Sequence, residues 1–167
     1  MVLGAVGFFA SFLIDSDDDG STPPRAEAEI PLLGGRKITL AEAESITPYD
    51  VPLPPTNTLT GELSGIYADP SAQVAYIWST DLRLYAQRTT MLEKAAVARW
   101  RQVVRSDDDG PFVMTRIPGH AALAAEMSET EPASLSWHQG KVSIQLVSPA
   151  HSLAQLKDIA REVRTES

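Results

Sequence analysis

The chain contains no cysteine. This absence excludes a disulfide framework, a thiolate nucleophile, a cysteine-ligated zinc site and an iron–sulfur cluster. It also excludes lipid modification of an N-terminal cysteine. It does not indicate the redox compartment, because a chain without cysteine is compatible with either side of a membrane.

Basic side chains are also scarce. Lys and Arg total 14 against 22 Asp and Glu, which gives a formal net charge of -8. Because binding to nucleic acid or to anionic lipid head groups needs clustered Lys and Arg, this balance disfavours both partners. The acidic excess is compatible with a basic partner or with cations. The 167 residues, 43% of them hydrophobic, predict one folded domain.

The longest apolar run is residues 1–14. It is short for a membrane span, which needs about 20 residues, and the first basic residue in the chain is Arg25, so the run lacks the positive start of an export signal. It is the end of a membrane anchor, an export signal, or a buried element of the fold. The first two interpretations predict a cell-membrane protein, single-pass or signal-anchored, with its domain outside the cytoplasm.

A linker is expected over residues 15–36, which are rich in Asp, Gly and Pro. Residues 15–20 have the Asp-x-Asp-x-Asp-Gly start of a calcium loop, but Ala26 stands where the bidentate Glu belongs. We therefore favour a solvated linker there, and a hairpin loop for the second acidic stretch at 106–110. The folded domain is expected over 37–165.

Helical spacing and capping signals predict helices at both ends of this domain. Thr39 and Glu42 make a capping box, and Ser152 can cap a second helix that carries an apolar face. Four prolines predict an extended segment over 47–60. The expected helices are 39–46, 152–164 and, with a more ambiguous pattern, 91–105.

The rest of the domain has the alternation of β-strands. Gly140 supplies the positive φ of one hairpin turn. The expected strands are 62–68, 73–78, 82–87, 112–117, 121–127, 135–137 and 142–147. The order predicts an α+β fold, with an antiparallel meander of about six to eight strands and the short N-terminal and the C-terminal helix packed on one face.

The order and spacing of several stretches give information that periodicity alone does not. These stretches are 38–43, 51–54 and Tyr67, then 116–121, 134–140, 142–147 and 153–160. Together they resemble an uncharacterised bacterial extracytoplasmic domain family found in membrane-anchored anti-sigma-factor-like proteins and in lipoproteins. That family is distantly similar to the half-barrels of lipoprotein carriers and sigma-E regulators. The resemblance covers about 37–163, departs from the family at 88–110 and after the Gly140 turn, and implies no catalytic residue.

No catalytic or nucleotide-binding motif stands out: the nucleophile elbow, the P-loop and the dinucleotide fingerprint are all missing. The three histidines, His120, His138 and His151, have no metal-ligand spacing, and turn positions explain them more simply. We predict that the chain is not an enzyme and uses no metal or cofactor.

Aromatic side chains gather on the expected strands, among them Tyr76, Trp78, Tyr85 and Trp137. Core packing explains them, and so does an apolar groove for an acyl chain or a peptide. We expect a membrane-tethered sensory or protein-interaction domain with a partner outside the cytoplasm. The alternative is a lipid or lipoprotein carrier-like domain with an apolar cavity, and a hydrolase with a polar cleft is less favoured.

Overall fold

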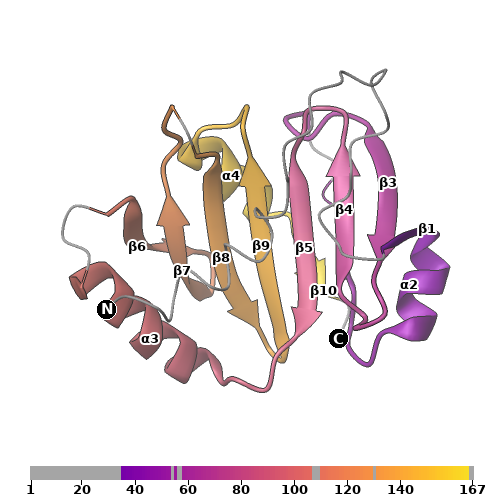
Figure 1. Ribbon diagram of the computed structural model, residues 1–167, viewed down its shortest axis with the longest axis horizontal. Helices are drawn as coiled ribbons and strands as arrows, with labels where there is room; N and C mark the ends of the chain where they lie inside the picture. Colours follow the sequence, from indigo (N-terminus) through magenta and orange to yellow (C-terminus); the bar gives the residue numbers. More distant parts are fainter. Residues whose placement is uncertain (1–34, 54, 56–57, 107–109, 130, 166–167) are drawn as a thin grey trace, which may run out of the picture.

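The computed structural model of the protein describes residues 35–53, 55, 58–106, 110–129 and 131–165 (Figure 1). An eight-stranded antiparallel sheet has the order β1-β3-β4-β5-β9-β8-β7-β6, and β2 pairs separately with β10. The large sheet contains β1 (Arg36–Ile38), β3 (Leu63–Ala68), β4 (Val74–Trp78), β5 (Arg83–Arg88), β6 (Phe112–Ile117), β7 (His120–Ala125), β8 (Ala133–Gln139) and β9 (Val142–Ser148). The other elements are α2 (Leu40–Ile46), α3 (Glu93–Ser106), α4 (Leu153–Ala160), β2 (Pro52–Leu53) and β10 (Arg164–Thr165). The α+β class and the antiparallel sheet predicted from the sequence are confirmed.

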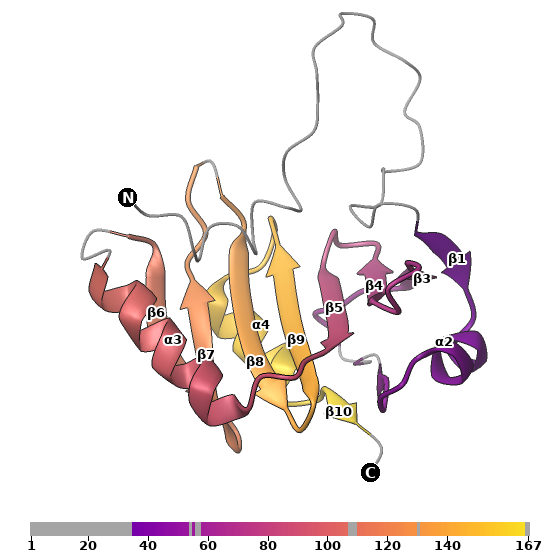
Figure 2. The ribbon, with the colours of Figure 1, turned by 60° about the horizontal axis from the view of Figure 1, so that its bottom comes forward.

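The large sheet is built from two meanders, and the expectation of a single meander is wrong in this respect. One meander is β3-β4-β5 and the other is β6-β7-β8-β9, and β5 pairs with β9. Helix α3 carries the chain between them (Figure 2). Its 14 residues give a length of about 21 Å, close to the roughly 19 Å covered by the four strand spacings from β5 to β6. Alternation along each strand contains no information on this pairing.

Strand alternation divides the sheet into two faces. We call the side of Val142, Ile144 and Leu146 in β9 the core face, because these residues belong to the large buried cluster. The opposite side, with Ser143 and Gln145, is called the α3 face. Helix α4 lies against β8 and β9 and contributes Leu153, Leu156, Ile159 and Ala160 to the core cluster. Helix α3 instead lies against β6, β7 and β8 on the other side of the sheet (Figure 2).

Two capping boxes start short helices where the sequence predicts them. At α2 the Thr39 side chain accepts from the Glu42 amide, and the Glu42 carboxylate accepts from the Thr39 amide at 2.7 Å. That backbone hydrogen bond, followed by the Thr39 hydroxyl, lowers the pKa of Glu42. Ser152 and Gln155 make the same exchange at α4. Each box satisfies two amides that a helix start leaves without partners.

The C-terminal helix is shorter than expected. It was predicted over 152–164 but ends at Ala160, and Arg164 and Thr165 form β10 opposite Leu53 and Pro52 of β2. Val163 is buried with only 7% of its surface exposed. The spacing of Val163 from the other apolar residues predicted that the helix continues. In the structure Val163 lies in the segment after the helix and packs into the core from there.

The extended segment 47–60 is fastened to the sheet by Tyr49. The Tyr49 hydroxyl lies 2.9 Å from the Ala72 carbonyl oxygen and 2.8 Å from that of Ala86. These carbonyls belong to the β3–β4 turn and to β5, so one side chain ties the segment to two parts of the first meander. Strand β2 lies within this segment, and neither β2 nor β1 was predicted as a strand.

Replacing Tyr49 with Phe removes the hydroxyl that makes both of these contacts. We expect the free energy of unfolding to fall by about 0.5–1.5 kcal/mol, measured by urea denaturation. Tyr67→Phe, which removes a hydroxyl from the α3 face, is the matched control and should cost less. Equal losses for the two variants would show that the Tyr49 contacts do not fasten the segment.

Candidate functional site

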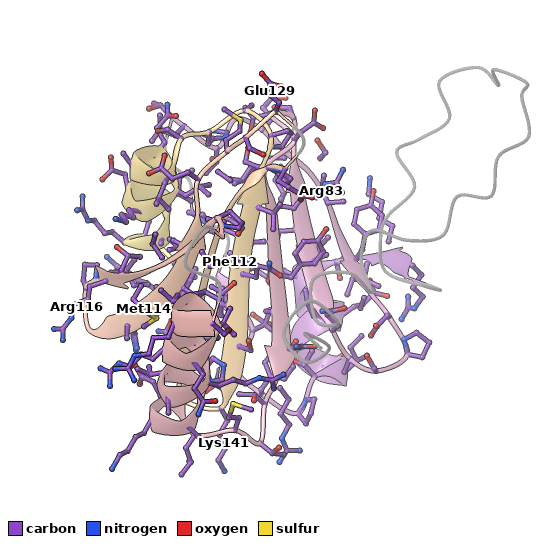
Figure 3. The ribbon with its side chains drawn as sticks, turned by 60° about the vertical axis from the view of Figure 1, so that its left-hand side comes forward. Arg83, Phe112, Met114, Arg116, Glu129 and Lys141 are labelled. Carbon is purple, nitrogen blue, oxygen red and sulfur yellow. The ribbon has the colours of Figure 1, made fainter. Side chains whose placement is uncertain are left out.

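A groove lies between α3 and the α3 face of the sheet. Figure 3 views the molecule with α3 toward the viewer and labels Phe112, one of the lining residues. The cavity of the groove has a volume of about 140 Å³. The lining residues come from β5 to β9 and from α3 with its lead-in: Gln87, Thr89, Met91, Ala96, Arg99, Trp100, Val103, Phe112, Leu123, Ser136, His138, Ser143 and Gln145. Both meanders therefore contribute to it.

The sheet side of the groove is polar and in register. His138 lies opposite Ser143, which lies opposite Gln87. One step along, Ser136 lies opposite Gln145. Because cross-strand neighbours have Cβ atoms about 5 Å apart, these side chains form two short rows of amides, hydroxyls and one imidazole.

The helix side of the groove is apolar. Ala96, Trp100 and Val103 of α3 face the sheet at helical spacing, and Phe112 and Leu123 continue this wall on β6 and β7. Only Ala96 is buried along the whole of α3, whereas α4 buries four of its 8 residues. Helix α3 is therefore the less firmly anchored of the two.

His138 is the most unusual residue in the groove. It is 6% exposed, and its ring meets Trp100 edge-on, with the centroids 5.4 Å apart and the planes at 88°. Burial lowers the pKa of His138, while a hydrogen bond to the Met91 backbone and the charge of Glu93 oppose this shift. Its Nδ1 is buried without a hydrogen-bond partner among the described residues.

The four aromatic residues singled out in the sequence do not form one groove. Tyr76, Trp78 and Trp137 lie in the core cluster and are at most 2% exposed. Tyr85 is on the other side of the sheet, in a small cluster with Ala75. Side chains alternate between the two faces along a strand, so Tyr76 and Trp78 of β4 point to the same face and Ala75 points to the other. Tyr85 of β5 lies opposite Ala75 and therefore shares the face of Ala75.

Tyr85 is the one of these four residues that lies close to the groove, since its cross-strand partner Gln145 lines the cavity. Burial raises the pKa of Tyr85, and Arg83 opposes that shift. Gln87, His138 and Gln145 were not recognised as lining residues in the sequence. The sequence did contain a signal for them: every second residue of 134–138 and 143–145 is polar, and these residues alternate with the apolar ones that face the core.

Ser148 and His151 have the contact geometry of a nucleophile and its base, with Oγ 2.7 Å from Nδ1. His151 Nε2 lies 2.8 Å from the Leu59 carbonyl oxygen, so Nε2 carries the hydrogen and Nδ1 accepts from Ser148. Ser148 is 0% exposed and His151 5%, and neither lines the groove. The pair fastens the extended segment to the turn before α4 and offers no route to a substrate.

The described ranges contain no group of three or more His, Asp or Glu side chains able to hold a metal ion. His120 lies at the start of β7, 3.5 Å from the Glu93 carboxylate, His138 lines the groove on the α3 face, and His151 lies after β9 against Ser148. The calcium-loop-like residues 15–20 lie outside the described residues, as does 107–109 of the second acidic stretch.

Among the described helices, none has the length and apolarity that crossing a membrane requires. The apolar segment 1–14 and the linker up to residue 34 lie outside the described part of the chain. The location of the domain therefore stays a prediction.

The chain matches no protein-family model, no curated protein and no solved structure. The resemblance to the extracytoplasmic family stays a prediction as well, and the groove must be interpreted from its own chemistry.

Loss of the Ser148 hydroxyl tests the structural role of the buried pair. In Ser148→Ala, His151 Nδ1 and the Ala150 amide lose their partner, and we expect a loss of about 1–3 kcal/mol in the free energy of unfolding. Ser143→Ala removes a hydroxyl at a half-buried position of the same strand and is the control. A stability loss no greater than the control would argue against the fastening role.

The lowered pKa of His138 has a consequence for stability against pH. Unfolding restores the ordinary value of 6.5, so below that pH the unfolded chain binds the proton more readily and stability falls by up to about 1.4 kcal/mol per pH unit until the folded value is reached. Urea denaturation of the wild type and of His138→Gln between pH 8 and pH 5 measures this difference. Parallel curves for the two proteins would contradict a lowered pKa.

Proposed function

We propose that this chain is a membrane-tethered sensory or protein-interaction domain that lies outside the cytoplasm and responds to a ligand bound beneath α3. In this proposal α2 and α4 together cover the core face and leave the α3 face for binding. The resemblance to extracytoplasmic domains and the apolar segment 1–14 support the location. The observation that carries the binding role is the groove itself, which has polar side chains on the sheet side and apolar side chains on the α3 side.

A sensory role needs an element whose position responds to occupancy, and α3 suits it. The groove separates part of this helix from the sheet. Among the residues of α3, only Ala96 is buried. A ligand beneath it would add contacts to a helix that has few. A ligand shifts the equilibrium between two positions of a helix only if it binds more tightly to one of them. In this proposal a ligand in the groove binds more tightly when α3 lies close to the sheet, and so it shifts the position of α3.

The outer side of α3 provides a surface for a partner. Lys94, Arg101 and Arg105 are exposed on this helix, although the whole chain carries a net charge of -8. A helix with four basic residues and one acidic residue is a local positive surface on an acidic domain. The chemistry favours an acidic partner protein, whose approach would depend on ionic strength.

The carrier-like alternative draws less support. It requires an apolar cavity between the sheet and its helices, and drug-sized ligands already occupy pockets of about 300 Å³ or more. The groove has a volume of about 140 Å³, and its sheet side is polar. On the core face the rings of Tyr76 and Trp78 pack against each other, with their centroids 6.0 Å apart. We therefore favour sensing or interaction over lipid transport.

The absence of cysteine allows a test of location without background labelling. In Glu129→Cys, an exposed side chain (Figure 3) becomes a single thiol. We expect a membrane-impermeant maleimide to label it in intact bacterial cells that produce the full chain, and the protein to sediment with membranes. Leu146→Cys, at a position 0% exposed, controls for unfolded protein and should stay unlabelled. Labelling of Glu129→Cys only after lysis would overturn the extracytoplasmic location.

A further inference from the structure

The two edges of the large sheet are built differently. At one edge β1 has three residues, of which Arg36 and Lys37 are exposed. The Lys37 ammonium donates to the Ser64 carbonyl oxygen at 3.1 Å, beyond the part of β3 that β1 pairs with. Short edge strands and basic side chains are devices by which proteins prevent pairing with another chain, and this edge uses both.

The other edge is longer and less protected. Strand β6 has six residues, with Arg116 as its only charged one and no proline. It pairs with β7 along its whole length without a register shift, and in the described part of the chain β7 is its only strand neighbour. In an antiparallel strand every second residue directs its N–H and C=O groups away from the strand it pairs with. The middle of β6, Val113–Arg116, therefore presents backbone donors and acceptors outward.

Apolar side chains accompany this edge on both faces of the sheet. Val113 lies opposite Ala124, which belongs to the core cluster. It is nevertheless 44% exposed, since α4 lies farther into the sheet, against β8 and β9. Met114 points to the α3 face and is half-buried, and Figure 3 labels it beside α3. A strand added next to β6 would cover Val113 on one face and Met114 on the other.

Helix α3 borders the same edge. Its first residue, Glu93, lies 3.5 Å from His120 at the start of β7. Val97 and Val104 follow Glu93 at helical spacing, so they lie on the side of α3 that faces β6 and β7. Both valines are half-buried. They extend the apolar surface of the β6 edge onto the helix.

The charges around this edge indicate which partner fits it. Lys94 and Arg101 are neighbours of Val97 on the surface of α3. Both of them, and Arg116 of β6, are exposed and form no ion pair with a described residue. A second copy of the chain would bring these positive charges against their own duplicates, whereas an acidic segment complements them.

We propose that β6 is the docking strand for the partner protein, and that an extended segment of this partner, with acidic and apolar side chains in alternation, pairs with Val113–Arg116. Main-chain hydrogen bonds extend the sheet by one strand. The acidic side chains lie on the α3 face near Arg101 and Arg116, and the apolar ones cover Val113 on the core face. This assignment rests on the proposed function, whose partner it specifies.

A synthetic heptapeptide of alternating Glu and Val, labelled with fluorescein, tests the assignment. It is titrated with the full chain in mild detergent, and binding is measured by fluorescence anisotropy. We expect saturable binding that weakens as the salt concentration rises. The same peptide with Lys in place of Glu should bind at least about tenfold more weakly, because its charges repel those of α3 and β6.

Hydrogen exchange of the backbone amides identifies where the peptide binds. Strand pairing protects amides that an edge strand otherwise leaves open to water. We expect a saturating concentration of the Glu–Val peptide to slow exchange within Val113–Arg116 at least about tenfold. Exchange within Arg36–Ile38 of β1, at the protected edge, should stay unchanged.

Variants with matched controls separate this edge from the rest of the surface. Val113→Lys adds a charge to the edge strand and should weaken peptide binding at least about tenfold. Leu63→Lys, with 41% exposure against 44% for Val113, is its control near the other edge. Arg116→Glu should also weaken binding, whereas Lys141→Glu makes the same change of charge at the β8–β9 turn and should not. Circular dichroism checks that each variant is folded.

Other outcomes overturn the assignment. If the Lys–Val peptide binds as tightly as the Glu–Val peptide, charge does not select the partner. If Val113→Lys and Arg116→Glu bind the peptide unchanged, the site lies elsewhere. If sedimentation shows a wild-type dimer that Val113→Lys dissociates, the occupant is a second copy. If no peptide binds at about 1 mM, β6 is not a docking strand, while labelling of Glu129→Cys still decides the location independently.

Discussion

Pairing between β5 and β9 is the constraint on which the rest of the structure depends. It joins two meanders into one sheet through six residue pairs in register, from Arg83 opposite Val147 to Arg88 opposite Val142. Register fixes the face of every side chain, because a slip of one residue would exchange the two faces. It therefore places Leu84 and Leu146 together in the core and brings Gln87, Ser143 and His138 into line on the α3 face.

The same pairing explains why the two faces have different characters. The core face is filled by large side chains such as Trp78 and Trp137 and is closed by α4 and by the segment that Tyr49 and His151 fasten. The α3 face has small and polar side chains on β8 and β9, and the cavity lies between them and α3. Trp100 reaches across this space to His138 and leaves the cavity beside them.

Most elements could be predicted from the sequence because their signals are local. The Thr39 and Ser152 caps, the hairpin at Gly140 with φ of 60° and the three helices all depend on neighbours within a few residues. The pairing of β5 with β9, the strand β10 and the position of α3 depend on distant partners. The groove was missed for the same reason: its walls come from segments that only the register brings together, so His138 looked like a hairpin residue.

The sheet topology also bears on how the chain folds. The β5 and β9 partners are separated in sequence by α3, β6, β7 and β8, so their contact must bear the entropy of closing a long loop. Each meander, by contrast, pairs strands that follow one another along the chain. Each meander can form early, whereas the groove does not exist until the central pair closes. A domain of this topology folds more slowly than a helical bundle of equal stability, and a chain that emerges from its N-terminus completes its site only when β9 has arrived.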